Sequence, residues 1–183
     1  MARLRPFAFL ALLLLALVVY ATHIRHEMID FLTWRQAVVR ALVAEPLYRP
    51  EDGHYQFKYL PLFALVMAPF GVIDQDTGKL LWFAILIGLL VLLLRWSVRA
   101  LPDKRLQQRT LLLFAILLMA KFYAHELLLG QTNLLLAALL MAGLVAVRRD
   151  WGLTAGALVG LAVFVKPYAL VLADVQGTEA VLP

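Results

Sequence analysis

Six apolar runs, separated by short polar or charged connectors, take up most of this chain. They lie at residues 6–21, 59–73, 80–94, 110–129, 134–147 and 151–165. A soluble domain has roughly half of its residues apolar, whereas 63% of these 183 residues are hydrophobic. We therefore expect several membrane-spanning helices and not one soluble core. The fold class that the sequence predicts is an all-α polytopic membrane protein.

The basic residues of the chain lie beside these apolar runs. The net charge is +5, and Arg and Lys cluster at the N-terminus, at 95–109 and at 148–149. No exposed aromatic residues are interleaved with them, so nucleic acid is not expected as a partner, whereas a membrane topology explains the clusters. The chain has no cysteine, which excludes disulfides and cysteine-ligated metal. Because the acidic residues form no dense cluster, neither a metal site nor another cofactor is predicted.

The first apolar run has two interpretations. Residues 6–21 end in small residues, Val19 and Ala21, as a cleaved signal peptide would. Further apolar runs follow, however, and Arg3 and Arg5 precede it. We therefore expect an uncleaved first span with the N-terminus in the cytoplasm.

The run at 59–73 decides the topology. If it crosses the membrane, the basic clusters at 95–109 and 148–149 fall outside; if it stays at the surface, both clusters are cytoplasmic, as the positive-inside rule requires. Pro61 and Pro69 also remove backbone donors, and lipid offers no substitute for the lost hydrogen bonds. We therefore expect this run to lie in the outer interface.

The resulting topology has about five spans, two juxtamembrane helices and one large outer loop. The spans are expected at about 6–22, 80–96, 110–129, 132–147 and 151–166, the loop at 23–79 and its helices at about 30–44 and 59–71. The loop, the turn at 130–133 and Lys166 then lie on the same side of the membrane. Residues 1–173 make up this domain, and the tail 174–183 does not continue its pattern.

Asp30 stands at the start of an amphipathic helix in the outer loop. The apolar positions after it form one stripe that can lie on the membrane surface: Phe31, Trp34, Val38 and Leu42. Asp30 is either the N-cap of this helix, with Glu27 favouring the positive end of the helix dipole, or a general base at the mouth of a cavity. The two interpretations are compatible, since a capping carboxylate is also a firmly held one.

Three ionisable residues interrupt the run at 110–129. Lys121 and His125 are four residues apart and share a helix face. Because charge inside a bilayer is costly, they and Glu126 either face a cavity or a partner, or the helix ends near Tyr123 and they reach the interface. His125 and Glu126 lack a second ligand pair at helical spacing, so they do not predict a metal site.

Two further segments carry polar groups on the outer side. The amides of Gln131 and Asn133, in a turn, either bind sugar hydroxyls or phosphate or satisfy the backbone at the bend. Lys166 either anchors the end of a span or offers a point charge to a lipid phosphate. Three glycines four residues apart predict a close approach between helices in lipid and no chemical role: Gly152, Gly156 and Gly160.

Several of these pieces, in this order, resemble glycosyltransferase family 87, whose members have the GT-C fold. They are Asp30-Phe31 with the amphipathic helix after it, Tyr59-Leu60-Pro61-Leu62, Gly130-Gln131-Thr132-Asn133-Leu134, and Gly156, Gly160 and Lys166-Pro167. The resemblance implies a bacterial plasma-membrane enzyme with an outward-facing active site. Its donor would be a polyprenyl-phosphate-linked sugar, commonly mannose, and its acceptor a glycan or glycolipid.

The resemblance implies the catalytic position of Asp30 and motif positions for Gln131, Asn133 and Lys166, and the chemistry of the side chains leads to a hypothesis for the other roles. Asp30 matches the catalytic position, and Lys166, with Lys58 or Arg25 as substitutes, would stabilise the leaving lipid phosphate. Gln131 and Asn133 would orient the sugar or line the cavity. The other residues expected to contact substrate are Tyr59, Glu27 and His125.

The chain departs from the family pattern in two respects. Leu60 replaces a proline, and the sequence stops soon after Lys166 although family members are longer and have more spans. We therefore expect only the N-terminal part of such a transferase, truncated in this chain. The alternatives are a non-catalytic multispan protein, either a transporter fragment or a partner subunit, and an inactive remnant of the family.

Overall fold

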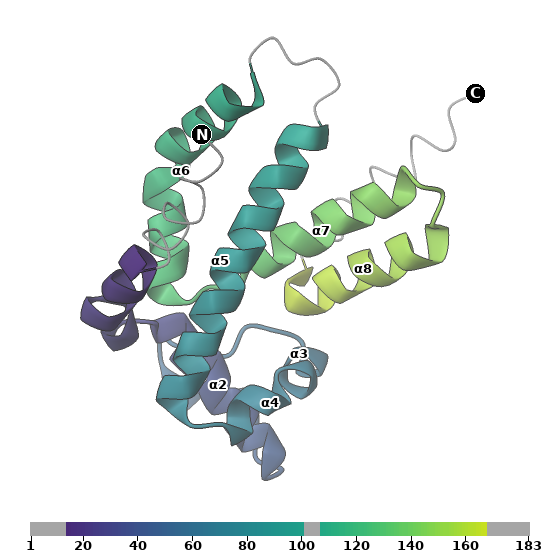
Figure 1. Cartoon of the computed structure of the whole chain (residues 1–183). Helices are drawn as coiled ribbons and strands as arrows, with labels where there is room; N and C mark the ends of the chain where they lie inside the picture. The colour runs from purple at the N-terminus through teal and green to yellow at the C-terminus, as the bar shows by residue number, and fades with distance from the viewer. Residues whose placement is uncertain (1–13, 101–106, 168–183) are drawn as a thin grey trace.

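The computed structural model describes residues 14–100 and 107–167, in which all the regular structure is helical (Figure 1). A helical segment at 14–22 is followed by the 3₁₀ turn η1. The further elements are η1 Ile24–His26, α2 Ile29–Leu42, η2 Pro50–Asp52, α3 Pro61–Val66, α4 Ala68–Val72, α5 Gln75–Ala100, α6 Gln108–Leu129, α7 Asn133–Val147 and α8 Gly152–Val165. The protein is therefore all-α.

Two of these helices are long and apolar enough to cross a membrane. They are the stretch Gln75–Arg99 of α5 and the whole of α6, Gln108–Leu129. α7 and α8 are even more apolar than α5 and α6 but contain only 15 and 14 residues. The expected first span begins outside the described residues, so the count of five spans stays a prediction.

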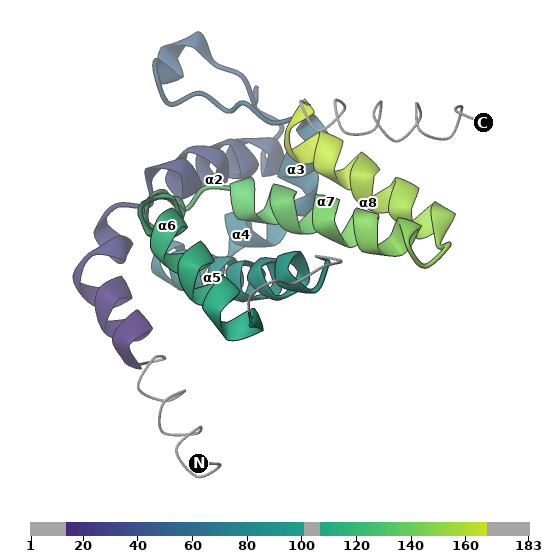
Figure 2. The same ribbon diagram turned by 90° about the horizontal axis from the view of Figure 1, so that it is seen from above.

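The helices run back and forth between two ends of the molecule (Figures 1 and 2). α5 leaves the end where α2, α3 and α4 gather, and α6 returns to it. α7 then runs outward and α8 comes back beside it. The start of α5, the turn at 130–132 and the end of α8 therefore lie at the same end as α2.

The apolar face of α2 forms the core of this end. Phe31, Trp34 and Val38 are fully buried. The Trp34 ring packs edge-on against Phe70 and Trp82, with ring centroids 5.5 and 5.3 Å apart. Three of the four positions expected to lie on the membrane surface are thus covered by α3, α4 and the start of α5, whereas the fourth, Leu42, is 49% exposed.

The segment expected as one helix at 59–71 is divided into α3 and α4. Met67 is both the C-cap of α3 and the N-cap of α4. Pro69 lies in the first turn of α4, where a backbone N–H would have no partner within the helix and its absence costs nothing. Inside a continuous helix, Pro69 would remove a backbone hydrogen bond and distort the helix. Arg35 of α2 donates to the carbonyls of Phe70 and Ile73 over 2.9 and 2.8 Å and so completes the end of α4.

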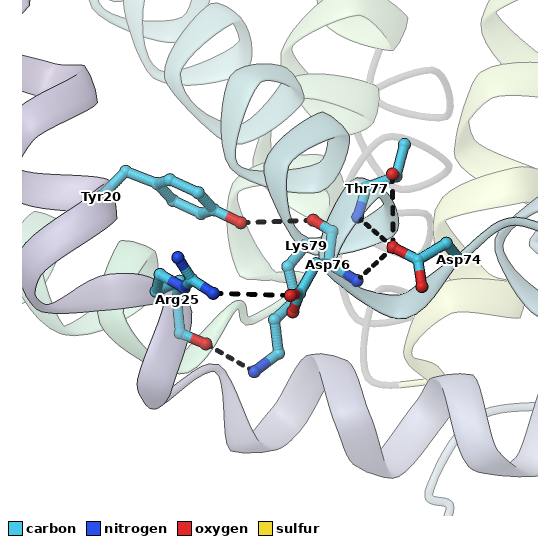
Figure 3. Close-up of polar contacts among 6 residues, drawn as sticks. All are labelled: Tyr20, Arg25, Asp74, Asp76, Thr77 and Lys79. Atoms are coloured by element: carbon cyan, nitrogen blue, oxygen red, sulfur yellow. Dashed lines mark hydrogen bonds and ion pairs between the residues drawn. The ribbon is translucent and has the colours of Figure 1, made fainter.

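Polar contacts fasten the first helical segment to the start of α5 (Figure 3). The Tyr20 hydroxyl donates to the backbone oxygen of Asp76 over 3.4 Å, and Arg25 pairs with the Asp76 carboxylate at 3.5 Å. The buried Lys79 ammonium donates to the backbone oxygen of Arg25 over 2.6 Å. The start of α5 thus serves as the anchor of the N-terminal segment.

Asp74 stabilises the start of α5 as a cap. Its Oδ2 accepts from the backbone N–H groups of Asp76 and Thr77, both over 3.1 Å, and from the Thr77 hydroxyl (Figure 3). These hydrogen bonds, led by the one from the Thr77 backbone, lower the pKa of the Asp74 carboxyl.

α7 and α8 pack closely, although not through the expected glycines. A Cβ on Gly152, Gly156 or Gly160 would meet no described atom within 4 Å. The close approach is at Gly143 of α7, where a Cβ would lie 3.1 Å from a methyl group of Val159. The glycine face of α8 therefore points away from α7.

Candidate functional site

A polar hollow of about 220 Å³ lies where α2, the loop before α3, the α6–α7 turn and the end of α8 meet. Its lining is Asp30, Thr33, His54, Tyr55, Gln56, Lys58, Tyr59, Gln131 and Lys166. Five of these residues were predicted from the sequence to act on substrate: Asp30, Lys58, Tyr59, Gln131 and Lys166. Segments far apart in the chain thus bring one carboxylate and two ammonium groups together.

Asp30 is half-buried and belongs to the first turn of α2. The expectation that it is the N-cap is wrong, because Met28 occupies that position with a left-handed backbone, φ 39°. The backbone N–H of Met28 donates to the carbonyl of Leu128 over 2.9 Å. A tertiary contact with the end of α6 therefore starts this helix, and the Asp30 carboxylate lines the hollow.

Gly130 places the α6–α7 turn against the start of α2. It ends α6 in a left-handed conformation, φ +68°, and its carbonyl accepts the Trp82 indole N–H over 2.9 Å. A Cβ on Gly130 would lie 2.9 Å from Cβ of Phe31 and 3.0 Å from Cε of Met28. Only glycine allows this approach without displacement, and the approach brings Gln131 to the hollow that Asp30 lines.

Tyr59 ties the loop before α3 to the same turn. The hydroxyl of the fully buried Thr132 donates to the Tyr59 hydroxyl over 3.3 Å. The Tyr48 hydroxyl donates to the Tyr59 carbonyl over 2.7 Å, and the Tyr59 ring stacks on Phe63 with centroids 4.3 Å apart. Tyr59 is therefore held on three sides.

Asn133 connects Glu126 to Lys166. Its Nδ2 donates to Oε1 of Glu126 and to Oε1 of Gln131, each over 2.6 Å. Its Oδ1 accepts a hydrogen bond from Nζ of the half-buried Lys166. Oε2 of Glu126 is buried and has no hydrogen-bond partner among the described residues.

Glu126 is the residue of this group that the sequence analysis did not assign to the site. The sequence did contain an indication of a functional role for Glu126, since an acidic side chain within an apolar run is unusual. Of the two interpretations left open for these residues, the one in which the helix ends near Tyr123 is wrong, because α6 continues to Leu129 and brings Glu126 to Asn133. Thr33, His54, Tyr55 and Gln56 also line the hollow without having been singled out.

The charges around Lys166 are mixed. Glu126 and Asp30 act on it as opposite charges and Lys58 as a like charge. Lys58 itself is exposed. An anion arriving at this end of the hollow would therefore meet one hydrogen-bonded ammonium group, that of Lys166, and one exposed ammonium group, that of Lys58.

Some of the predicted residues lie elsewhere. Glu27 and His125 are exposed and do not line the hollow, so their contact with substrate stays a prediction. Arg25 pairs with Asp76 at the anchor of the first helical segment and not with the hollow. Within residues 14–100 and 107–167, no group of three His, Asp or Glu side chains is placed to hold a metal ion.

Comparison with known families decides what kind of protein this is. The family description "Glycosyltransferase family 87" matches residues 57–174, more than half of the chain. The chain belongs to glycosyltransferase family 87. The resemblance predicted from the sequence is thereby confirmed. No curated protein and no solved structure matches the chain.

Family 87 membership makes this chain a glycosyltransferase by family, and its two long apolar helices are consistent with a membrane protein. The matched segment contains Lys58, Tyr59, Gln131, Asn133 and Lys166. Asp30 and α2 precede the match, and the structure connects them to it through the hollow.

Proposed function

We propose that this family 87 chain transfers a mannose-like sugar from a polyprenyl-phosphate donor to a glycan or glycolipid acceptor. The observation that supports it is the pairing, in one hollow, of the Asp30 carboxylate with the Lys166 ammonium. Group transfer from a phosphate needs a base for the incoming hydroxyl and positive charge for the outgoing oxygen. The hollow offers both.

Asp30 would act as the general base. As the acceptor oxygen attacks the anomeric carbon, its proton passes to the Asp30 carboxylate. The bond between the anomeric carbon and the phosphate oxygen breaks, and its electron pair leaves with the lipid phosphate. Because attack and departure take place on opposite sides of that carbon, the configuration inverts.

Lys166 would stabilise the leaving phosphate. Its ammonium is held by Asn133 Oδ1 and so faces the hollow with little freedom. Lys58 supplies a second positive charge from the loop before α3. Gln131, Asn133 and Tyr59 would orient the sugar through their amide and hydroxyl groups. No role remains for Arg25 in this arrangement.

The distribution of charge supports an active site on the outer face of a bacterial plasma membrane. Arg95 and Arg99 lie near the end of α5, and Arg148 and Arg149 lie between α7 and α8. Figure 1 shows the end of α5 and the α7–α8 turn away from α2, which carries Asp30. Under the positive-inside rule these residues mark the cytoplasmic end.

The substitution Asp30→Asn tests the proposal. Membranes containing the full chain are supplied with polyprenyl-phosphate mannose, and transfer to endogenous acceptors is followed. We expect transfer to fall by about 10²- to 10⁴-fold, as for the loss of a general base, while the amount of inserted protein is unchanged.

The matched control is Asp150→Asn. Asp150 is exposed in the turn between α7 and α8 and does not line the hollow, and its φ of 58° suits asparagine equally well. It should transfer at the wild-type rate. Normal turnover by Asp30→Asn would eliminate Asp30 as the base.

A further inference from the structure

A second hollow lies beside the first and has no role in the mechanism above. It has a volume of about 290 Å³ and is lined by Ile29, Leu32, Thr33, Gln36, Asp52 and Tyr55. Thr33 and Tyr55 line both hollows, so they form the wall between them. Lys58, Gln131 and Lys166 line only the first hollow, and Gln36 and Asp52 only the second.

The geometry of α2 places this second hollow next to Asp30. Asp30, Thr33 and Gln36 follow one another at intervals of three residues. With 3.6 residues per turn, each interval falls about 60° short of a full turn. Around the helix, Thr33 therefore lies between Asp30 and Gln36, and a ligand on the Gln36 side would reach the Asp30 carboxylate past the Thr33 side chain.

The two hollows differ in charge. Among the described residues, no lysine or arginine lines the second hollow, and the charged residue of its lining is Asp52. The Arg40 guanidinium holds the Asp52 carboxylate through two hydrogen bonds of 3.1 and 2.6 Å. A phosphate would meet a carboxylate and no unpaired cation there, whereas a neutral ligand would meet no such repulsion.

The lining groups suit a saccharide. Tyr55 leaves 51% of its surface exposed, so its ring offers an apolar face beside a polar hydroxyl. Gln36 provides an amide that both donates and accepts. The Thr33 hydroxyl donates to the Ile29 carbonyl over 2.8 Å, which leaves its lone pairs to accept from a ligand hydroxyl.

We propose that this second hollow is the acceptor site, binding a neutral sugar between Tyr55 and Gln36 with its attacking hydroxyl directed past Thr33 to Asp30. The inference rests on the proposed function, because the first hollow must hold the donor phosphate near Lys166. Direct displacement requires the nucleophile to enter from the side opposite the leaving group. Thr33 and Tyr55 line both hollows and Lys166 only the first, so an acceptor in the second hollow would approach from a different side than the leaving phosphate.

Binding is tested without turnover, by saturation-transfer difference NMR on the full chain in detergent. The probes are the methyl α-glycosides of mannose, glucose and galactose, without donor. We expect at least one probe to bind wild type. Tyr55→Ala and Gln36→Ala should each weaken that binding about tenfold, the loss expected for an aromatic or hydrogen-bonding anchor.

Three controls accompany these variants. Tyr55→Phe keeps the ring and should keep most of the binding. Gln75→Ala makes the same change as Gln36→Ala at an exposed position of α5 and should bind as wild type does. Asp30→Asn removes the proposed base without emptying the hollow and should also retain binding.

Kinetics separate this inference from the proposed function. With polyprenyl-phosphate mannose as donor and the bound glycoside as acceptor, Tyr55→Ala and Gln36→Ala should each raise the acceptor KM about tenfold. Gln36→Ala should leave the donor KM unchanged, because Gln36 lines only the second hollow. If wild type binds a glycoside in this hollow but transfers no sugar to it, the saccharide site is supported and the proposed transferase function is contradicted. If wild type transfers and both variants keep the wild-type acceptor KM, the acceptor site is overturned and the transfer stands. Failure of all three glycosides to bind wild type overturns the acceptor site as well.

Discussion

Asn133 holds Glu126 with a hydrogen bond of 2.6 Å between its Nδ2 and Glu126 Oε1. The other face of the same amide, Oδ1, accepts from the Lys166 ammonium. Because the nitrogen must face the carboxylate and the oxygen must face the ammonium, only one orientation of the amide satisfies both neighbours. Glu126 therefore acts on the position of Lys166 without touching the hollow that Lys166 lines.

Substitution of Glu126 should weaken the hold on Lys166. Glu126→Ala removes one of the two acceptors of Asn133 Nδ2 and leaves the other, Gln131 Oε1; the loss of one such hydrogen bond costs about 0.5–1.5 kcal/mol. We expect a raised donor KM and a lower melting temperature in detergent. Glu126→Gln keeps an acceptor oxygen at this place and should have the smaller effect. Glu51→Gln, at an exposed carboxyl in η2, should resemble wild type; a wild-type donor KM in Glu126→Ala would contradict the positioning role.

The two lysines of the hollow should contribute unequally. Lys166 is half-buried and hydrogen-bonded, whereas Lys58 is exposed. Lys166→Gln should raise the KM for polyprenyl-phosphate mannose about tenfold or more, since a hydrogen bond to a charged group contributes about 1.5–3 kcal/mol. Lys58→Gln should raise it only a few-fold, because exposed charges contribute roughly 1 kcal/mol or less. An equal effect of the two substitutions would contradict the assignment of the phosphate to Lys166.

The sequence predicted which segments meet at the candidate site better than it predicted where the individual helices begin and end. Apolar runs that reverse direction at short connectors must return to the same end, so the meeting of Asp30, Gln131 and Lys166 follows from hydropathy and charge alone. The start of α2 could not be predicted, because the contact between Met28 and Leu128 that begins the helix joins segments far apart in the chain. The same limit applies to Glu126, whose partner Asn133 becomes visible only when α6 continues past Tyr123.

Gly130→Ala should destabilise the protein. A side chain at φ +68° costs about 1–2 kcal/mol on its own, and the new Cβ would lie 2.9 Å from Cβ of Phe31. The turn would have to move away from α2, which should lower both the melting temperature and transfer. Gly88→Ala is the matched control, since a Cβ at this position in the middle of α5 would meet no described atom within 4 Å. Equal melting temperatures for the two variants would show that the turn is not tightly packed on α2.

The ion pair between Arg40 and Asp52 should make stability depend on pH in the acid range. The hydrogen bonds from Arg40 lower the pKa of the Asp52 carboxyl below its ordinary value, so the folded protein binds this proton less readily than the unfolded chain. The contribution to stability is therefore fully present above the unfolded pKa of about 3.9 and is lost as the pH falls through the lower folded pKa. Only Asp52 faces the Arg40 guanidinium as a described ion-pair partner, and Arg40 is buried.

Asp52→Asn should therefore behave differently at neutral and at acid pH. At pH 7 it leaves the buried Arg40 guanidinium without a carboxylate, and we expect a lower melting temperature than wild type. As the pH falls through the range in which Asp52 takes up its proton, wild type loses the stabilisation from this ion pair. The melting temperatures of wild type and Asp52→Asn should therefore converge. The measurement is the melting temperature of the full chain in detergent across the acid range, with Glu51→Gln as a neighbouring control that retains the wild-type pH dependence. If Asp52→Asn and wild type stay separated by a constant interval at every pH, the ionisation of Asp52 does not stabilise the loop that bears it.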